Sequence, residues 1–177
     1  TASGYQSLYS ITTGSYNTTS GFYSLLSNTT GSFNTTSGFY SLLYNTTGNY
    51  NTTSGFYSLY NNKSATSTTA LGYSAGQGPA AYSNQGGTYL GYQSGYSAAT
   101  GSDYNTLLGY NSGYNVTTGS NNIWLGSATS STAVANLTTG SQNILIGNNI
   151  SLPSATASGQ LNIGNLIYGT GITGTGS

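Results

Sequence analysis

The chain has neither histidine nor cysteine, and its 177 residues include one basic side chain, Lys63, and one acidic side chain, Asp103. General acid–base catalysis needs a histidine or a carboxylate, usually with a partner, and metal sites need several such ligands. We therefore expect no enzyme activity, no cofactor and no metal site. A single lysine without arginine cannot neutralise a phosphate backbone, which argues against nucleic acid as a partner.

Long apolar runs are also missing. None approaches the roughly 20 residues of a membrane-spanning helix, so we expect no membrane insertion. No charged segment followed by an apolar one marks a signal peptide. Because Gly4 and Tyr5 already occupy the phase of the later repeats, we interpret the chain as a piece of a longer protein.

What the chain does contain is a repeat of glycine, serine, threonine, asparagine and tyrosine. Residues 15–31 and 32–48 are identical at fifteen of seventeen positions, and residues 49–65 continue the series with a changed end. Such a repeat indicates stacked structural units that share one core. The repeat glycines are spaced by 17 as far as Gly72 and less regularly beyond it: Gly4, Gly21, Gly38, Gly55, Gly72, Gly91, Gly109, Gly126, Gly147 and Gly164.

The regularity of the repeat divides the chain into four segments. In order, these are regular Thr/Asn-rich repeats, an irregular loop or insertion, degenerate repeats with a more apolar core, and a Gly/Thr-rich C-terminal linker: 1–72, 73–90, 91–164 and 165–177. A further insertion near 127–136 accounts for one interval of 21 residues.

Each unit lacks the 3.6-residue stripe of a helix and has room for two short strands and two turns. We predict an all-β fold, a parallel β-roll or β-solenoid of about ten coils with a 17-residue repeat. One of the two strands changes along the chain from NTTSG at 17–21 to NTLLG, NIWLG and NILIG, which predicts a better-packed core in the C-terminal coils.

Three residue columns recur in the run after each repeat glycine. The second column admits polar residues (Gln6, Tyr23, Tyr40, Tyr57) and is predicted to be exposed. Strict alternation would place the leucines of the third column, at 8, 25, 42 and 59, on that same face. Covering them requires a bend or another chain, and we favour another chain, hence a homotrimer. The first column is always aromatic and is predicted to be interior: Tyr5, Phe22, Phe39, Phe56, Tyr73, Tyr92 and Tyr110.

The units NTTSGFYSLLSNTTG, GYNSGYNVTTGSNNIWLG and TTGSQNILIGNN resemble the head repeats of trimeric autotransporter adhesins (YadA-like) and of phage tail fibres. The closing stretch 158–177, SGQLNIGNLIYGTGITGTGS, is similar to the segment that precedes an intramolecular chaperone in many phage-like fibres. The resemblance implies a homotrimer of parallel β-rolls in an extracellular, cell-surface or virion fibre. The chain departs from the family in having threonine and serine where alanine and isoleucine are common.

Nine Asn-x-Ser/Thr sequons give the asparagines two alternative roles. They are N-glycosylation sites, or they form amide ladders that satisfy the backbone groups of stacked turns. The recurrence of the repeat favours ladders. The sequon asparagines are Asn17, Asn28, Asn34, Asn45, Asn51, Asn62, Asn115, Asn136 and Asn149.

Tyr23, Tyr40 and Tyr57 form a line at the spacing of the coils and are candidate contacts for a cell-surface glycan or protein, although stacking on each other is the favoured alternative. The sequence thus predicts a structural and adhesive fibre segment that assembles as a homotrimer or larger. Two alternatives remain, a self-assembling extracellular filament and a Thr-rich ice-binding solenoid. The GxGxxG match at 169–174 lacks the helix and acidic residue of a dinucleotide site and predicts only a linker.

Overall fold

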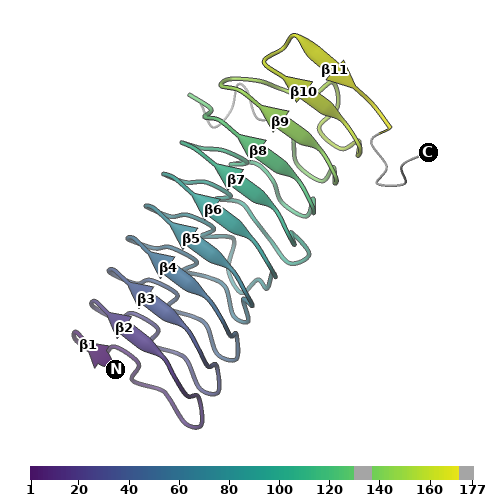
Figure 1. Cartoon of the computed structure of the whole chain (residues 1–177). Coiled ribbons are helices and arrows are strands. Elements are labelled where there is room, and N and C mark those ends of the chain that lie inside the picture. Colours follow the sequence, from purple (N-terminus) through teal and green to yellow (C-terminus); the bar gives the residue numbers. More distant parts are fainter. Residues whose placement is uncertain (130–136, 172–177) are drawn as a thin grey trace.

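The computed structural model describes residues 1–129 and 137–171. The chain winds as a parallel β-solenoid in which ten short strands stack in chain order, separated by nine turns, with an eleventh strand antiparallel to the tenth (Figure 1). The described residues contain no helix, and so none that could cross a membrane. The strands are β1 (Ala2–Ser3), β2 (Thr18–Ser20), β3 (Thr35–Ser37), β4 (Thr52–Ser54), β5 (Thr69–Leu71), β6 (Thr88–Leu90), β7 (Thr106–Leu108), β8 (Ile123–Leu125), β9 (Ile144–Ile146), β10 (Leu161–Ile163) and β11 (Ile167–Gly169).

The solenoid and its 17-residue spacing agree with the prediction, but each coil holds one three-residue strand rather than two. The run expected to be the other strand, such as Phe22–Leu25, is a series of turns in which Tyr23 and Leu25 have φ values of 55° and 54°. Backbone hydrogen bonds still join the coils there, as between the Leu25 N–H and the Ser41 carbonyl at 3.0 Å. Two segments expected to be irregular also contain strands, β6 within 73–90 and β11 within 165–177.

The left-handed conformation of these turn residues inverts the predicted faces. Alternation holds only for extended backbone, and here the leucine column turns inward: Leu25, Leu42 and Leu59 are fully buried. The aromatic column predicted to be interior lies on the surface instead, with Phe39 37% exposed. The leucines therefore need no second chain to cover them, and the predicted basis for a trimer is wrong.

The core is supplied from opposite sides of the coil in the two halves of the solenoid. In the N-terminal coils the turn contributes leucine, while the strand contributes a threonine whose hydroxyl bonds to a serine, as Thr36 does with Ser24 at 2.5 Å. In the C-terminal coils the strand contributes Tyr89, Leu107, Trp124 or Leu145, all buried. The column that holds leucine earlier then becomes glycine at positions 76, 95 and 113.

Steric exclusion explains why glycine replaces leucine in the turn when the strand supplies a large side chain. A Cβ atom on Gly95 would lie 2.5 Å from the Tyr89 ring, and one on Gly113 would lie 2.4 Å from Leu107. Both glycines keep φ near 60°, close to the value that the leucines adopt. Most coils thus bury one large apolar side chain, taken either from the turn or from the strand, whereas the coil of β5, with Ala70 and Gly76, supplies none at these two positions.

Asparagine side chains form two ladders through the N-terminal coils. Asn34 donates from Nδ2 to the Asn17 Oδ1 atom at 3.1 Å, and Asn51 does the same to Asn34 at 2.8 Å. In the second ladder Asn45 donates to the Asn28 Oδ1 atom at 2.9 Å. The amides also bond to turn carbonyls and to the backbone N–H of the next coil. The ladder that begins at Asn17 resumes in the later coils with Asn105, Asn122, Asn143 and Gln160.

The insertion after β5 brings two tyrosines into the core. Tyr82 donates its hydroxyl to the Gly76 carbonyl, and the Tyr89 hydroxyl accepts from Asn84 Nδ2 at 2.7 Å. Burial raises the pKa of both phenols above the usual value of 10. Both side chains therefore stay neutral in the folded chain well beyond the pH at which an exposed tyrosine ionises.

We expect the free energy of unfolding to fall as the pH rises above 10. There the unfolded chain loses the protons of Tyr82 and Tyr89 while the folded chain keeps them. The loss is about 1.4 kcal/mol per pH unit for each tyrosine, and below pH 10 both groups are neutral in both states, so their contribution is constant. Urea unfolding at pH 8, 10 and 11 measures the slope. The variant Tyr89→Phe should reduce the slope by the contribution of one tyrosine. A free energy of unfolding that stays constant up to pH 11 would contradict the burial of these phenols.

Candidate functional site

The most extensive feature of the surface is a stack of seven exposed aromatic rings, which we call the aromatic ladder. Each ring lies two residues beyond a strand and stacks on the equivalent ring of the next coil, with centroids 5.0–5.4 Å apart and planes within 19° of parallel. The rings are between 37% and 59% exposed. The ladder consists of Tyr5, Phe22, Phe39, Phe56, Tyr73, Tyr92 and Tyr110.

Glycine makes this stack possible. The repeat glycine before each ladder residue has φ near 130°, and a Cβ on Gly38 would lie 2.6 Å from the carbonyl oxygen of Gly55. The coils can therefore approach each other closely enough for the rings to stack. Because the ring faces cover one another, the ladder presents ring edges to solvent along most of its length. Ring edges carry the positive part of the aromatic quadrupole and attract oxygen-rich groups.

The candidate contacts Tyr23, Tyr40 and Tyr57 form a second file beside the ladder. They are half-buried and stack on one another at 5.5 and 5.4 Å, as the alternative interpretation expected. Their rings are tilted against ladder rings at close range, 4.2 Å between Phe39 and Tyr40. Burial is the largest cause that raises the pKa of Tyr23. These tyrosines thus support the ladder more than they offer a separate surface.

Sequence reasoning missed a shorter aromatic stack. Tyr16, Phe33 and Tyr50 stack at 4.9 and 5.0 Å and are all exposed. Each has a φ of 59° and precedes a buried ladder asparagine. Their recurrence at the repeat spacing was the available signal.

The sequon asparagines fall into separate environments. Asn115 is half-buried, Asn136 lies outside the described residues, and Asn149 is exposed, with its Oδ1 atom accepting from the backbone N–H of Thr129 at 2.7 Å. The other six are buried, and a glycan on any of them would have to break into the core. They are Asn17, Asn28, Asn34, Asn45, Asn51 and Asn62.

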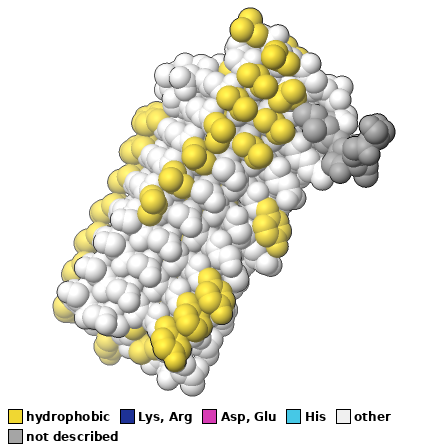
Figure 2. All heavy atoms as spheres, in the orientation of Figure 1, with side chains coloured by type: hydrophobic (Ala, Val, Ile, Leu, Met, Phe, Trp, Pro, Cys, Tyr) yellow, Lys and Arg dark blue, Asp and Glu magenta, His cyan; other side chains and the backbone are white. Residues whose placement is uncertain are grey.

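The outer face of the sheet changes along the solenoid. In β2 to β4 it presents threonine and serine in register, Thr18, Thr35 and Thr52 opposite one another. From β5 onward the serine file is replaced by leucine, whereas the threonine file continues through Thr69, Thr88 and Thr106 and becomes isoleucine only at β8. Figure 2 shows apolar side chains gathered over the later strands. The exposed members of this apolar strip include Leu71, Ile123, Leu125 and Ile146.

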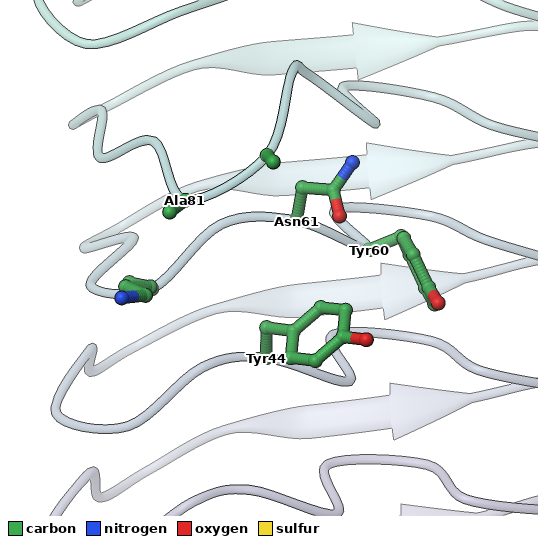
Figure 3. Close-up of a pocket in the computed structure, with 6 residues that line it drawn as sticks. Tyr44, Tyr60, Asn61 and Ala81 are labelled. Carbon is green, nitrogen blue, oxygen red and sulfur yellow. The ribbon is translucent and has the colours of Figure 1, made fainter.

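A small pocket lies where the regular coils meet the insertion (Figure 3). Its volume is about 250 Å³, just below the range of about 300–1,000 Å³ that is usual for ligand pockets. Burial and the neighbouring Tyr44 raise the pKa of Tyr60 to about 12, so its hydroxyl remains neutral at ordinary pH. The pocket is lined by Tyr44, Tyr60, Asn61, Lys63, Ala80 and Ala81.

No family model, curated protein or solved structure matches this chain. Its surface chemistry is therefore interpreted from the residues themselves. The surface offers the aromatic ladder, an outer sheet face that bears hydroxyl and apolar groups, and a pocket lined in part by the chain's single lysine.

Proposed function

We propose that the chain is the attachment segment of an extracellular fibre and that it assembles as a homotrimer, with the sheet faces turned inward and the aromatic ladders outward. The observation that carries the proposal is the exposed ladder, which repeats one uncharged apolar contact over seven coils. Repeated weak contacts on a rigid rod add up through effective concentration. The resemblance to trimeric adhesin heads and tail fibres supports the same function.

The apolar strip on the outer sheet face replaces the leucine column as the basis for assembly. Leu125 and Ile146 are each 38% exposed, next to one another on paired strands. A contiguous exposed apolar strip on a soluble protein marks an interaction surface. A second copy of the same strip is the partner proposed here, and three copies around one axis would bury it on every chain.

The target proposed for the ladder is a neutral, hydroxyl-rich polymer. One lysine and one aspartate provide no field to steer a charged partner. Hydroxyl oxygens suit the positive ring edges, and the tyrosine hydroxyls of the ladder add donors and acceptors. Such a polymer, running along the rod, would meet the same contact at every coil.

Attachment to beads of a neutral polysaccharide, such as cross-linked dextran, tests the function. We expect the bound fraction to change less than about twofold between about 20 and 500 mM salt, since few ion pairs exist to be screened. The triple variant Phe22→Ser, Phe39→Ser, Phe56→Ser should bind at least about tenfold less. The matched control replaces Tyr9 and Tyr104, which are exposed but stand outside both stacks.

A hundredfold loss with salt, or equal binding by the ladder variant, would contradict the proposal. Sedimentation of the same samples measures the assembly, and we expect three times the chain mass of 18.1 kDa. Circular dichroism of each variant checks that the solenoid is intact.

The register of the threonines favours one second candidate, the ordering of water or ice on the face of β2 to β4. Thr18, Thr35 and Thr52 form a straight file, with Ser20 and Ser37 in a parallel file beside it. This function needs the sheet face to be free. A monomeric mass in solution would therefore favour the second candidate. A trimeric mass would contradict it, because the proposed trimer buries the threonine file.

A further inference from the structure

Departures from the repeat gather around the pocket. The two nearly identical units 15–31 and 32–48 differ at only two positions, and one of these changes Ser27 into Tyr44. In the third unit the positions of Leu43, Tyr44 and Thr46 become Tyr60, Asn61 and Lys63. Residues from two successive coils that break the repeat thus line one open pocket, and Ala80 and Ala81 of the insertion complete its lining.

Tyr44 is unlike the ladder tyrosines because its ring is not part of a stack. The residues at its position in the coils before and after are Ser27 and Asn61. Its ring contact is with Tyr60, at 5.1 Å and 74° between the planes, an edge-to-face arrangement. Figure 3 shows the two rings at the same side of the pocket. The pocket therefore offers a ring face, which suits the C–H face of a sugar ring, where the ladder offers edges.

Hydrogen bonds hold the Asn61 amide and the backbone of Lys63 in place. Asn61 donates from Nδ2 to the Gly78 carbonyl of the insertion at 2.8 Å, which leaves its Oδ1 atom on the side of Tyr60 (Figure 3). The backbone of Lys63 is bonded on both sides, donating to the Tyr82 carbonyl and accepting from the Thr46 N–H, each at 2.8 Å. The amide and the Lys63 backbone are thereby fixed relative to the two rings, and the exposed Lys63 side chain extends from this fixed point.

Lys63 gives the pocket the one positively charged side chain of the sequence. The one acidic side chain, Asp103, lies on another coil, where its Oδ1 atom accepts from the Gln85 N–H at 2.8 Å. A ligand with a carboxylate would supply the missing counter-charge. A ligand with hydroxyls would also use the Asn61 oxygen and the tyrosine hydroxyls.

We propose that this pocket binds a pyranose ring that bears a carboxylate, such as a uronic acid residue of an acidic glycan. The sugar's C–H face would lie on Tyr44, its carboxylate at Lys63 Nζ and a hydroxyl at Asn61 Oδ1. This is a single specific site, distinct from the repeated neutral contact of the ladder. The two can operate on one surface polymer or on different ones.

The test compares methyl glucuronide with methyl glucoside, which differ only at C6, a carboxylate in the first and a hydroxymethyl group in the second. Chemical-shift titration of the isotope-labelled chain at low salt should give a dissociation constant at least about fivefold lower for the glucuronide. Lys63→Gln should remove this preference, and Lys63→Arg should keep it. Tyr44→Ser, which restores the residue of the first unit, should weaken both sugars at least about tenfold.

Equal affinity for the two sugars, no binding of either, or a preference that survives in Lys63→Gln would overturn the proposal. Tyr9→Ser is the matched control, an exposed tyrosine far from Lys63 in sequence and outside the pocket. Attachment to neutral beads should be unchanged in Lys63→Gln, so failure of this site and failure of the ladder are told apart by separate variants.

Discussion

Replacing Leu42 by alanine is expected to reduce the free energy of unfolding by about 2–5 kcal/mol, because the side chain is fully buried in the core. Replacing it by glycine should be no worse, which reverses the usual order. Leu42 has a φ of 53°, a conformation that costs residues with a Cβ about 1 kcal/mol and glycine almost nothing. Glycine loses the same packing as alanine and regains this strain.

The control is Leu107, which is equally buried but lies in the extended backbone of β7. There the glycine variant should be less stable than the alanine variant by about 0.5–1 kcal/mol. Urea unfolding of the four variants measures both differences. The same order at both positions would show that the backbone of Leu42 is not left-handed. Phe39→Ala should cost less than Leu42→Ala, since the Phe39 ring is partly exposed.

Replacing Asn34 by alanine should cost about 4 kcal/mol, from four lost hydrogen bonds at about 1 kcal/mol each. The amide Nδ2 donates to Asn17 and to the Gly48 carbonyl, and the Oδ1 atom accepts from the backbone and side-chain N–H groups of Asn51. All of this is buried, so water cannot replace the lost partners.

Asn49 is the matched control in the next repeat unit. Its Oδ1 atom accepts from the Ser32 N–H at 2.7 Å, but the side chain is half-exposed and water can take its place. Asn49→Ala should cost less than about 1 kcal/mol. Similar losses at Asn34 and Asn49, measured by urea unfolding, would mean that the ladder contributes no more than a surface contact.

The repeat spacing was sufficient to predict a solenoid, because stacking is the only way for such short units to share a core. It was insufficient to orient the side chains. Phe22 was placed inside because its column is always aromatic, and Tyr23 outside because its column admits polar residues. The two-residue alternation of strands then placed Leu25 on the face of Tyr23, and this alternation fails where Tyr23 and Leu25 adopt positive φ. Non-glycine residues rarely do so. The exchange of leucine for glycine in one column, at 59 and 76, was the sequence signal for it.

The two candidate sites also differ in how far the sequence could predict them. The ladder could be recognised as a column, since its residues are aromatic in seven successive coils, although its exposure could not. The pocket could not be predicted from the repeat. It depends on how the insertion folds back to place Ala80 and Ala81 beside Tyr44, and an irregular segment carries no periodic pattern from which to infer this.

The reversed strand β11 caps the parallel stack at its β10 edge. Parallel strands stacked in register are also the arrangement by which amyloid fibrils recruit further chains. At the β10 end, β11 pairs antiparallel with Leu161, Asn162 and Ile163, and Asn162 turns its amide to Asn165 within the same hairpin. A further coil arriving there would find neither the strand direction nor the amide row that it needs. The hairpin therefore protects the β10 edge against the in-register addition of parallel strands that would lead to a fibril.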